Sequence, residues 1–279
     1  MSRVVVITGG ASGIGLGLAE ALLARGDRVA ICGRSEGKLR SAADRLRDVA
    51  QDRILTVVAN VAVESDVASL FSATCDTFGV PDILVNNAGA FDGGPLEDLS
   101  LESWQRVLDA CLTGSFLCSR EAFRLMKPQR RGRILNIGSI SAQRPRLNSA
   151  AYTAAKFGVE GLTQAAALEG RQWGISVGCL HPGNVLVERR LSSGLAADDE
   201  PMMSTDSIVQ AALVMLNMPD GVNFLNAKTL PKDPWGNEYH YQLQGSQYAI
   251  VSYGADGQPG GSKYDADISS EDLGADGNK

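Results

Sequence analysis

The chain has 279 residues, of which 44% are hydrophobic and 21% charged, which is enough apolar material for one large domain or one domain with a small appendage. Its formal net charge of -6 argues against a nucleic-acid partner, because proteins that follow a phosphate backbone carry a basic excess. No apolar run approaches the roughly 20 residues that span a bilayer, so we expect no membrane partner, no export signal and a cytoplasmic protein. The five cysteines contain no CxxC pair, which favours reduced thiols.

Short apolar runs alternate with helical patterns through most of the chain. We expect strands at 4–8, 28–32, 54–59, 83–86, 133–137 and 176–180, and helices at 13–25, 35–50, 64–78, 101–126 and 150–173. Strands that are apolar throughout and separated by amphipathic helices indicate a parallel sheet covered on both faces. The predicted fold class is therefore α/β, a doubly wound parallel sheet of about seven strands, with residues 222–225 as the last.

A glycine-rich turn, Thr8-Gly9-Gly10-Ala11-Ser12-Gly13-Ile14-Gly15, joins the first predicted strand to the first predicted helix. Glycines at such a turn let backbone N–H groups approach a pyrophosphate, and the helix N-terminus adds a partial positive charge. We therefore predict a dinucleotide site here. The predicted contacts are Gly9, Ser12, Gly13, Ile14 and Gly15. A tight turn without a ligand is the alternative for this motif taken alone.

Four further motifs follow in chain order. They are Asn86-Asn87-Ala88-Gly89 after the fourth predicted strand, Ser139 after the fifth, Tyr152-Thr153-Ala154-Ala155-Lys156 in the last helix, and Pro182-Gly183 after the sixth strand. Together with the TGxxxGxG turn, this series resembles the short-chain dehydrogenase/reductase family over residues 1–229.

The resemblance implies a Rossmann-like fold and a nicotinamide cofactor that exchanges a hydride with a small alcohol or carbonyl substrate. It also implies a homodimer or homotetramer that packs through the helices at 101–126 and 150–173. Further cofactor contacts are implied at Asn87, Gly89, Pro182, Gly183 and Val185.

The second predicted strand ends in Cys32-Gly33-Arg34, which bears on the choice of cofactor. An NAD enzyme places a carboxylate there for the ribose 2′-OH, whereas an NADP enzyme removes that charge and supplies a cation. Gly33 stands at the acidic position and Arg34 can form a bidentate pair with a 2′-phosphate, so we predict NADP(H). A solvated surface arginine is the alternative. Asn60 and Val61 close the third strand and are implied contacts near the adenine.

Tyr152 and Lys156 are four residues apart, so both side chains leave the same helix face. An isolated tyrosine is a poor base at neutral pH, but a neighbouring ammonium favours the phenolate, which can take a proton from an alcohol. By resemblance, Ser139 hydrogen-bonds the substrate oxygen, and Tyr152 and Lys156 also contact the cofactor. Ser139, Tyr152 and Lys156 are thus the predicted catalytic residues. An ordinary surface pair is the alternative for YxxxK alone, and His181 is interpreted as a packed strand-end residue.

Two positions depart from the family pattern. Cys111 stands where the family has a catalytic Asn, and Val187 stands where it often has a Thr. Residues 184–203 resemble the mobile substrate loop of the family but do not name a substrate. The departures leave open one alternative function, a scaffold that binds NADP(H) without turnover.

Composition changes near residue 226. Tyr152 is the only tyrosine before this point, whereas five follow it, and no arginine occurs after Arg190. We predict two domains, 1–229 and 230–279. The second resembles the C-terminal region of the major pseudopilin of type II secretion systems, which implies calcium ligands at Asp256, Asp265 and Asp267. A solvated acidic tail is the alternative, and a natural fusion, a chimera and an assembly artefact stay open as origins. A second alternative function is a fusion in which residues 1–229 carry a calcium-binding, pseudopilin-like module.

Overall fold

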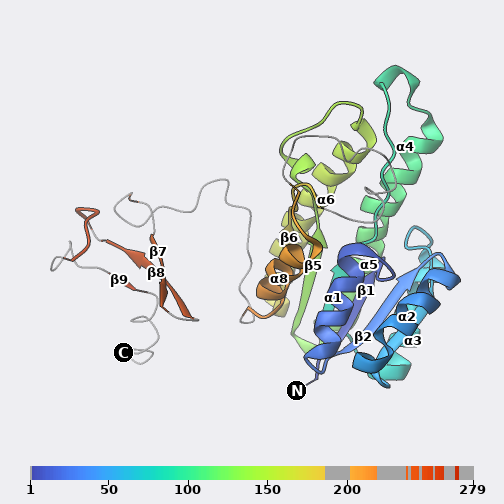
Figure 1. Ribbon diagram of the computed structural model, residues 1–279, viewed down its shortest axis with the longest axis horizontal. Coiled ribbons are helices and arrows are strands. Elements are labelled where there is room, and N and C mark those ends of the chain that lie inside the picture. The colour runs from blue at the N-terminus through green and yellow to red at the C-terminus, as the bar shows by residue number, and fades with distance from the viewer. Residues whose placement is uncertain are drawn as a thin grey trace. The chain divides into compact units, whose positions relative to one another are not determined.

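The computed structural model describes residues 2–185, 202–218, 237, 240–244, 247–253, 255–260 and 268–269. The chain forms two compact units, Met1–Leu225 and Asn226–Lys279, which divide close to the change in composition. The first unit is a sheet with helices packed against it, and the second contains three short strands (Figure 1).

Six strands of the first unit form one parallel sheet in the order β3-β2-β1-β4-β5-β6. They are β1 (Val4–Thr8), β2 (Arg28–Gly33), β3 (Ile54–Val58), β4 (Ile83–Asn86), β5 (Gly132–Ile137) and β6 (Ile175–Leu180). The predicted doubly wound α/β fold is confirmed, and each of these six strands agrees with its prediction to within one residue at either end. The direction of winding reverses between β1 and β4, which is the place where open sheets of this kind bind ligands.

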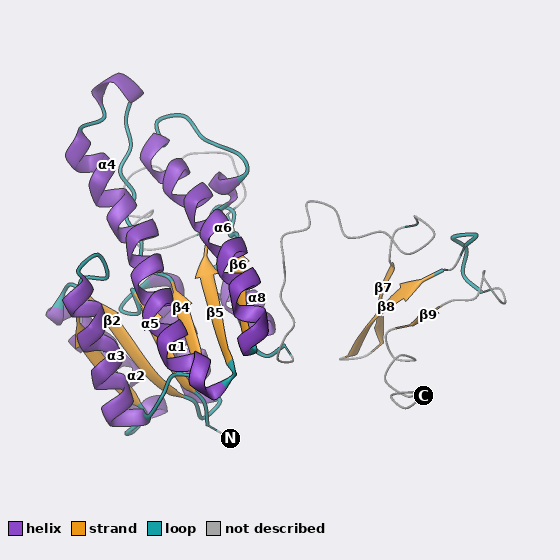
Figure 2. Ribbon diagram, turned by 180° about the vertical axis from the view of Figure 1, so that it is seen from behind, coloured by secondary structure: helices purple, strands orange, loops and turns teal. Residues whose placement is uncertain are grey.

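Helices cover both faces of the sheet (Figure 2). They are α1 (Gly13–Ala24), α2 (Glu36–Ala50), α3 (Glu64–Phe78), α4 (Leu101–Leu108), α5 (Gly114–Gln129), α6 (Ala150–Gly170) and α8 (Thr205–Leu216). Alternate residues of β1 enter two separate cores. Val5 and Ile7 pack with apolar residues of α1, α2 and α8, whereas Val6 packs with those of α3, α5 and α6. Burial of each large aliphatic side chain contributes about 1.5–3 kcal/mol, so the two cores hold the strand ends in place.

The predicted helix at 101–126 is wrong in one respect, because it is interrupted. A π-helical turn, η2 (Asp109–Thr113), separates α4 from α5. A π turn adds one residue within a helix that otherwise continues, and residues 109–113 contain no glycine or proline that would mark the change. Three short 3-10 segments also occur: η1 (Leu96–Asp98), η3 (Ile140–Ala142) and η4 (Arg171–Trp173).

Helix α8 was not predicted, although its start carries a local signal. The Ser204 side chain accepts a hydrogen bond from the Ser207 backbone N–H at 3.1 Å, which caps the helix. Val209 and Leu213 then enter the core with α1. The predicted strand at 222–225 lies outside the described residues.

The second unit contains a small antiparallel sheet in the order β7-β8-β9. Its strands are β7 (His240–Gln244), β8 (Gln247–Ser252) and β9 (Ile268–Ser269). Over the described residues of the whole chain, no helix combines the length and the apolar character that crossing a bilayer requires.

Candidate active site

The glycine turn is locked against the end of β4. Thr8 Oγ1 accepts hydrogen bonds from the backbone N–H groups of Asn87 and Ala88, each at 3.0 Å. The Asn87 carboxamide in turn donates to the carbonyl oxygens of Thr8 and Gly9, also at 3.0 Å. Gly9 has a φ of +64°, and a Cβ at Gly15 would lie 2.5 Å from the Gly9 carbonyl oxygen. Only glycine fits these two positions without a backbone shift, and the turn leads directly into α1.

A cavity of about 720 Å³ opens beside this turn. Its lining includes Gly9, Gly33, Arg34, Asn60, Val61 and Gly89. Five of these six residues were predicted from the sequence as cofactor contacts. The sixth, Gly33, was identified only as the position that lacks a carboxylate. The opposite wall is α4, and its residues Glu102, Gln105 and Arg106 were not predicted.

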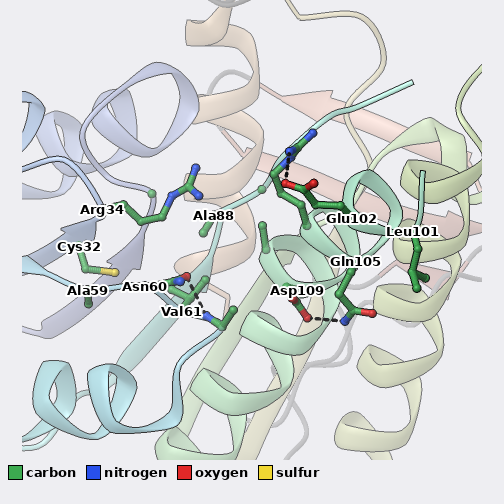
Figure 3. A pocket seen from close by; sticks show the side chains of 16 residues that line it. Cys32, Arg34, Ala59, Asn60, Val61, Ala88, Leu101, Glu102, Gln105 and Asp109 are labelled. Carbon is green, nitrogen blue, oxygen red and sulfur yellow. Dashed lines mark hydrogen bonds and ion pairs between the residues drawn. The ribbon is translucent and has the colours of Figure 1, made fainter. Parts of the chain in front are cut away.

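Arg34 is the notable charge of this cavity. Figure 3 shows its side chain extending from the end of β2 into the space above Asn60 in this view. The side chain is exposed and makes no ion pair within the described part of the chain. Asn60 instead has a local role, since its Oδ1 accepts from the Ala62 backbone N–H at 3.2 Å. A glycine turn with room for a pyrophosphate, beside an uncommitted guanidinium, fits a dinucleotide that carries a 2′-phosphate.

The thiol of Cys32 also lines the cavity, and burial raises its pKa to about 12. A thiol held in its neutral form is a poor nucleophile, so Cys32 acts as a small apolar wall residue.

Tyr152 and Lys156 lie one turn apart in α6, next to the end of β5. Lys156 is only 5% exposed, and its Nζ lies 5.5 Å from the centre of the Tyr152 ring. The same Nζ donates to the carbonyl oxygen of Ile137 at 2.7 Å, two residues before Ser139. The hydroxyl of half-buried Tyr152 has no hydrogen-bond partner among the described residues. The ammonium therefore ties the tyrosine helix to the serine segment and leaves the phenol open to a ligand.

Ser139 is held as a hydrogen-bond acceptor at the start of η3. Its Oγ accepts from the backbone N–H of Ser141 at 3.1 Å, and its side chain is largely buried. An oxygen fixed in this way keeps its own hydrogen free to donate to another oxygen. The structure thus brings the three predicted catalytic residues to one region between β5 and α6.

The backbone after β6 runs alongside the serine segment. The Pro182 carbonyl oxygen accepts from the Ile140 N–H at 3.0 Å, and Val185 forms an isolated β-bridge with Met203. Gly183 lies near the Met203 sulfur, with 3.8 Å between that atom and a Cβ built on the glycine. Val187 and most of the predicted substrate loop lie outside the described residues.

With this geometry, the family can be stated. Residues 3–195 match the family model of the short chain dehydrogenases. The chain belongs to the short chain dehydrogenase family. Residues 212–271 match the model of protein G of the type II secretion system, so both resemblances drawn from the sequence are confirmed. The second match begins within α8, a helix that packs in the first unit.

Individual dehydrogenases and reductases are also similar to this chain. The cis-4-hydroxycyclohexanecarboxylate dehydrogenase of Sinomonas cyclohexanicum is 40% identical over 203 residues, which cover 72% of this chain and 80% of that relative. A solved structure of an actinorhodin polyketide ketoreductase with NADPH has a TM-score of 0.73 and 27% identity, and covers 81% of this chain and 98% of its own. ElxO with NADP bound has a TM-score of 0.73 and 26% identity, with coverages of 80% and 96%. The chain is therefore an oxidoreductase of the short chain dehydrogenase family.

The departure at Cys111 is a structural substitution. Its Sγ lies 3.4 Å from both the backbone nitrogen and the carbonyl oxygen of Ala90, directly after the Asn-Asn-Ala-Gly motif. The Cys111 carbonyl oxygen, within the π turn, accepts from Ser115 Oγ at 2.7 Å. The thiol is a weaker hydrogen-bond partner than a carboxamide, but it contacts both the backbone nitrogen and the carbonyl oxygen of Ala90. Cys111 thus packs the α4–α5 junction against the end of β4.

Phe91 is a site residue that sequence reasoning missed. Its ring meets Tyr152 edge-on, with centroids 5.3 Å apart and an interplanar angle of 66°, and it is 46% exposed. The loop after Phe91 is tied to the segment before α6, because Gly94 N–H donates to the Asn148 carbonyl at 3.1 Å. Phe91 could have been identified from its position two residues after Gly89, because loops that follow parallel strands often line binding sites.

The predicted calcium ligands gain no support from the described residues. Asp256 is exposed, and its Oδ1 accepts from the Gln258 N–H at 3.0 Å in a local turn. Asp265 and Asp267 lie outside the described residues. The calcium site stays a prediction.

Proposed function

We propose that this oxidoreductase uses NADP(H) to interconvert a small alcohol and its carbonyl, with Ser139, Tyr152 and Lys156 as the catalytic residues. The observation that carries the proposal is the Lys156 ammonium, which is buried beside Tyr152 and hydrogen-bonded two residues from Ser139. The dinucleotide, when bound beside the glycine turn, supplies or accepts the hydride.

The residues of the chain then handle the proton. In the oxidation direction Tyr152 accepts the proton of the alcohol, and in reduction its hydroxyl donates one to the carbonyl oxygen. Lys156 stabilises the negative charge on the phenolic oxygen, because its ammonium is buried and lies 5.5 Å from the centre of the Tyr152 ring. Ser139 donates its hydroxyl hydrogen to the same substrate oxygen, because its Oγ is already satisfied as an acceptor.

Arg34 supports the choice of NADP(H) over NAD(H). It is exposed at the rim of the cavity, and Gly33 offers no carboxylate to bind a ribose 2′-hydroxyl. Two of the structural neighbours hold NADPH or NADP, which points the same way. Gly9, Ser12, Gly13, Ile14 and Gly15 would hold the pyrophosphate, and the remaining predicted contacts would hold the other parts of the dinucleotide.

The names of the relatives direct the choice of substrate probes. One relative acts on a hydroxycyclohexanecarboxylate, so 4-hydroxycyclohexanecarboxylate and its 4-oxo form are the first pair to test, followed by acyclic hydroxy acids and uncharged cyclic alcohols. Phe91 offers an apolar ring beside Tyr152, which favours a substrate with a hydrocarbon ring near the reacting carbon.

The test is a panel of these alcohols and carbonyls with each of the four nicotinamide forms, followed by the absorbance of the reduced nicotinamide. It is run on the full chain and on a version that ends at Thr229, because we assign the activity to residues 1–229. We expect turnover with NADP(H) in both versions and at least tenfold lower kcat/KM with NAD(H). Equal kcat/KM for both cofactors would exclude the NADP(H) assignment. Activity only in the full chain would exclude the assignment of the activity to residues 1–229.

We also assign a homo-oligomeric state to the chain. Phe116 on α5 and Phe157 on α6 are 44% and 48% exposed, and exposed aromatic side chains of this size are typical of surfaces that pack against another subunit.

A further inference from the structure

A histidine side chain lies against the backbone of the catalytic serine. Nδ1 of His181 lies 2.9 Å from the Ser139 carbonyl oxygen and 3.3 Å from the Ser139 backbone nitrogen. Nε2 lies 2.8 Å from Glu160 Oε2, and the side chains of His181 and Glu160 are 13% and 14% exposed. Both ring nitrogens therefore have partners, and the ring joins α6 to the serine segment in a place largely shielded from water.

The His181 ring lies between two backbone hydrogen bonds that join the serine segment to the residues after β6. Gly138 N–H donates to the Leu180 carbonyl at 2.7 Å, and Ile140 N–H donates to the Pro182 carbonyl at 3.0 Å. Ser139 lies between these donors, and His181 lies between their acceptors. A Cβ on Gly138 would lie 2.7 Å from His181 Nδ1, so only glycine allows the ring to approach.

Tyr152, Lys156 and Glu160 are successive residues of one helix stripe, each four positions after the last. The Tyr152 ring contacts Phe91, Lys156 hydrogen-bonds to the Ile137 carbonyl, and Glu160 holds the ring that contacts Ser139. One face of α6 thus fixes both the proton donor and the segment that carries the serine.

We propose that His181, oriented by Glu160, is a positioning residue for the catalytic serine. It holds the Ser139 backbone so that the hydroxyl keeps its direction toward the substrate oxygen. This inference rests on the proposed function, because it assigns His181 a role through Ser139 and none in the proton transfer itself.

The other titratable groups around the ring do not favour a metal site. Cys179 on β6 and Lys156 on α6 also face this region, and the ligand atoms of Glu160, Cys179 and His181 lie within 4.8 Å of one another. Burial, with Glu160 adding to it, raises the pKa of the Cys179 thiol to about 12. A metal needs a free imidazole nitrogen, whereas both nitrogens of this ring are already hydrogen-bonded, Nδ1 to the Ser139 backbone and Nε2 to Glu160.

Two conservative variants separate the two contacts of the ring. The carboxamide of Asn reaches about as far as Nδ1, and that of Gln about as far as Nε2. His181→Gln therefore keeps the hydrogen bond to Glu160 and loses the contact with the Ser139 backbone. His181→Asn keeps the contact with the Ser139 backbone and loses the hydrogen bond to Glu160. We expect His181→Gln to lower kcat about tenfold and His181→Asn about threefold, with the KM for NADPH unchanged in both.

The deciding measurement is a double-mutant cycle with Ser139→Ala. If His181 acts through the serine, His181→Gln adds less than a twofold further loss of kcat in the Ser139→Ala background. Full additivity of the two losses, or a rise in the KM for NADPH that accompanies them, would overturn the proposal. Gln164→Ala is the matched control, because Gln164 is exposed and donates to the other Glu160 oxygen at 2.7 Å, so we expect its kcat within twofold of the parent.

A second readout works without any turnover. The chain has only two histidines, so the ring nitrogens of His181 can be assigned by NMR on full-length protein with the help of a His240 variant. We expect Glu160→Gln to shift the Nε2 resonance and His181→Gln to shift the Ser139 amide resonance. No shift in either would overturn the inference, whereas both shifts without turnover on any substrate would count against the proposed reaction alone. Stoichiometric zinc in the purified protein would also overturn it.

Discussion

Beside the end of β5, Lys156 is 5% exposed and bound to the Ile137 carbonyl, whereas at the rim of the cavity beside the glycine turn Arg34 is exposed and makes no ion pair with any described residue. We call these the tyrosine end (Ser139, Tyr152 and Lys156) and the arginine end (Arg34 and Asn60). A proton transfer requires one fixed geometry, and buried hydrogen bonds provide it. Discrimination between two cofactors requires only a charge within reach, and a surface side chain provides that. Substitutions at the tyrosine end should therefore change the rate, and those at the arginine end the choice of cofactor.

Tyr152→Phe should have the largest effect. It removes the hydroxyl and leaves the ring, its contact with Phe91 and its neighbour Lys156 in place. We expect kcat to fall roughly a thousandfold, which is within the range of general acid–base catalysis, while the Kd for NADPH changes less than threefold. Steady-state kinetics and fluorescence titration of NADPH measure the two quantities. Tyr253→Phe, the same chemical change in the second unit, is the control, and a Tyr152→Phe protein with more than a tenth of the parent kcat would refute the assignment.

Gly15→Ala should weaken the binding of both cofactors, because it disturbs the glycine turn. The new Cβ would lie 2.5 Å from the Gly9 carbonyl oxygen and from the Asn87 side chain, so the turn must move. We expect a rise of at least tenfold in the KM for NADPH and NADH alike, since the pyrophosphate contacts are common to both. Gly37→Ala is the matched control. Nothing lies within 4 Å of that position in α2, and alanine there should raise the free energy of unfolding by about 0.5–1 kcal/mol without a kinetic effect.

Sequence reasoning worked best where the chemistry repeats along the chain. Val5, Val6 and Ile7 belong to a strand buried on both faces, and that pattern predicted the sheet. The spacing of Tyr152 and Lys156 likewise predicted their common helix face. The contact of His181 with Glu160 was beyond reach, because these residues are 21 positions apart and only the packing of α6 against β6 brings them together. His181 was interpreted only as a packed strand-end residue.

The π turn at Cys111 shows a second kind of limit. It adds one residue within a helix that otherwise continues, with no glycine or proline at 109–113 to mark it, and the contact between Cys111 Sγ and Ala90 depends on the phase of the helix. The Arg34 prediction shows the opposite case. A charged residue at the rim of a cavity can be identified from its position directly after a strand. The ligand that it binds cannot be identified in this way.

Arg34→Ala should affect the arginine end alone. Loss of a charge-assisted contact with a 2′-phosphate raises the KM for NADPH by roughly ten- to a hundredfold, and the KM for NADH stays within twofold. Because the tyrosine end is untouched, kcat at saturating cofactor should not change. Arg45→Ala removes an exposed arginine that is paired with Glu20 and serves as the control for net charge. Equal changes for the two cofactors would mean that Arg34 does not read the phosphate.

Cys111→Ala should have the smallest effect, and it tests the junction between α4 and α5. The thiol is 1% exposed and contacts Ala90 from both sides, so its removal leaves a small cavity and loses two weak hydrogen bonds. We expect the free energy of unfolding to fall by about 1 kcal/mol, which corresponds to a drop in Tm of about 2–4 °C by calorimetry. Because the contact is to backbone and not to substrate, kcat should remain within threefold in Cys111→Ala and in Cys111→Asn. A Cys111→Asn protein with a tenfold higher kcat would instead show that the carboxamide takes part in turnover, and that the thiol limits the rate of the natural chain.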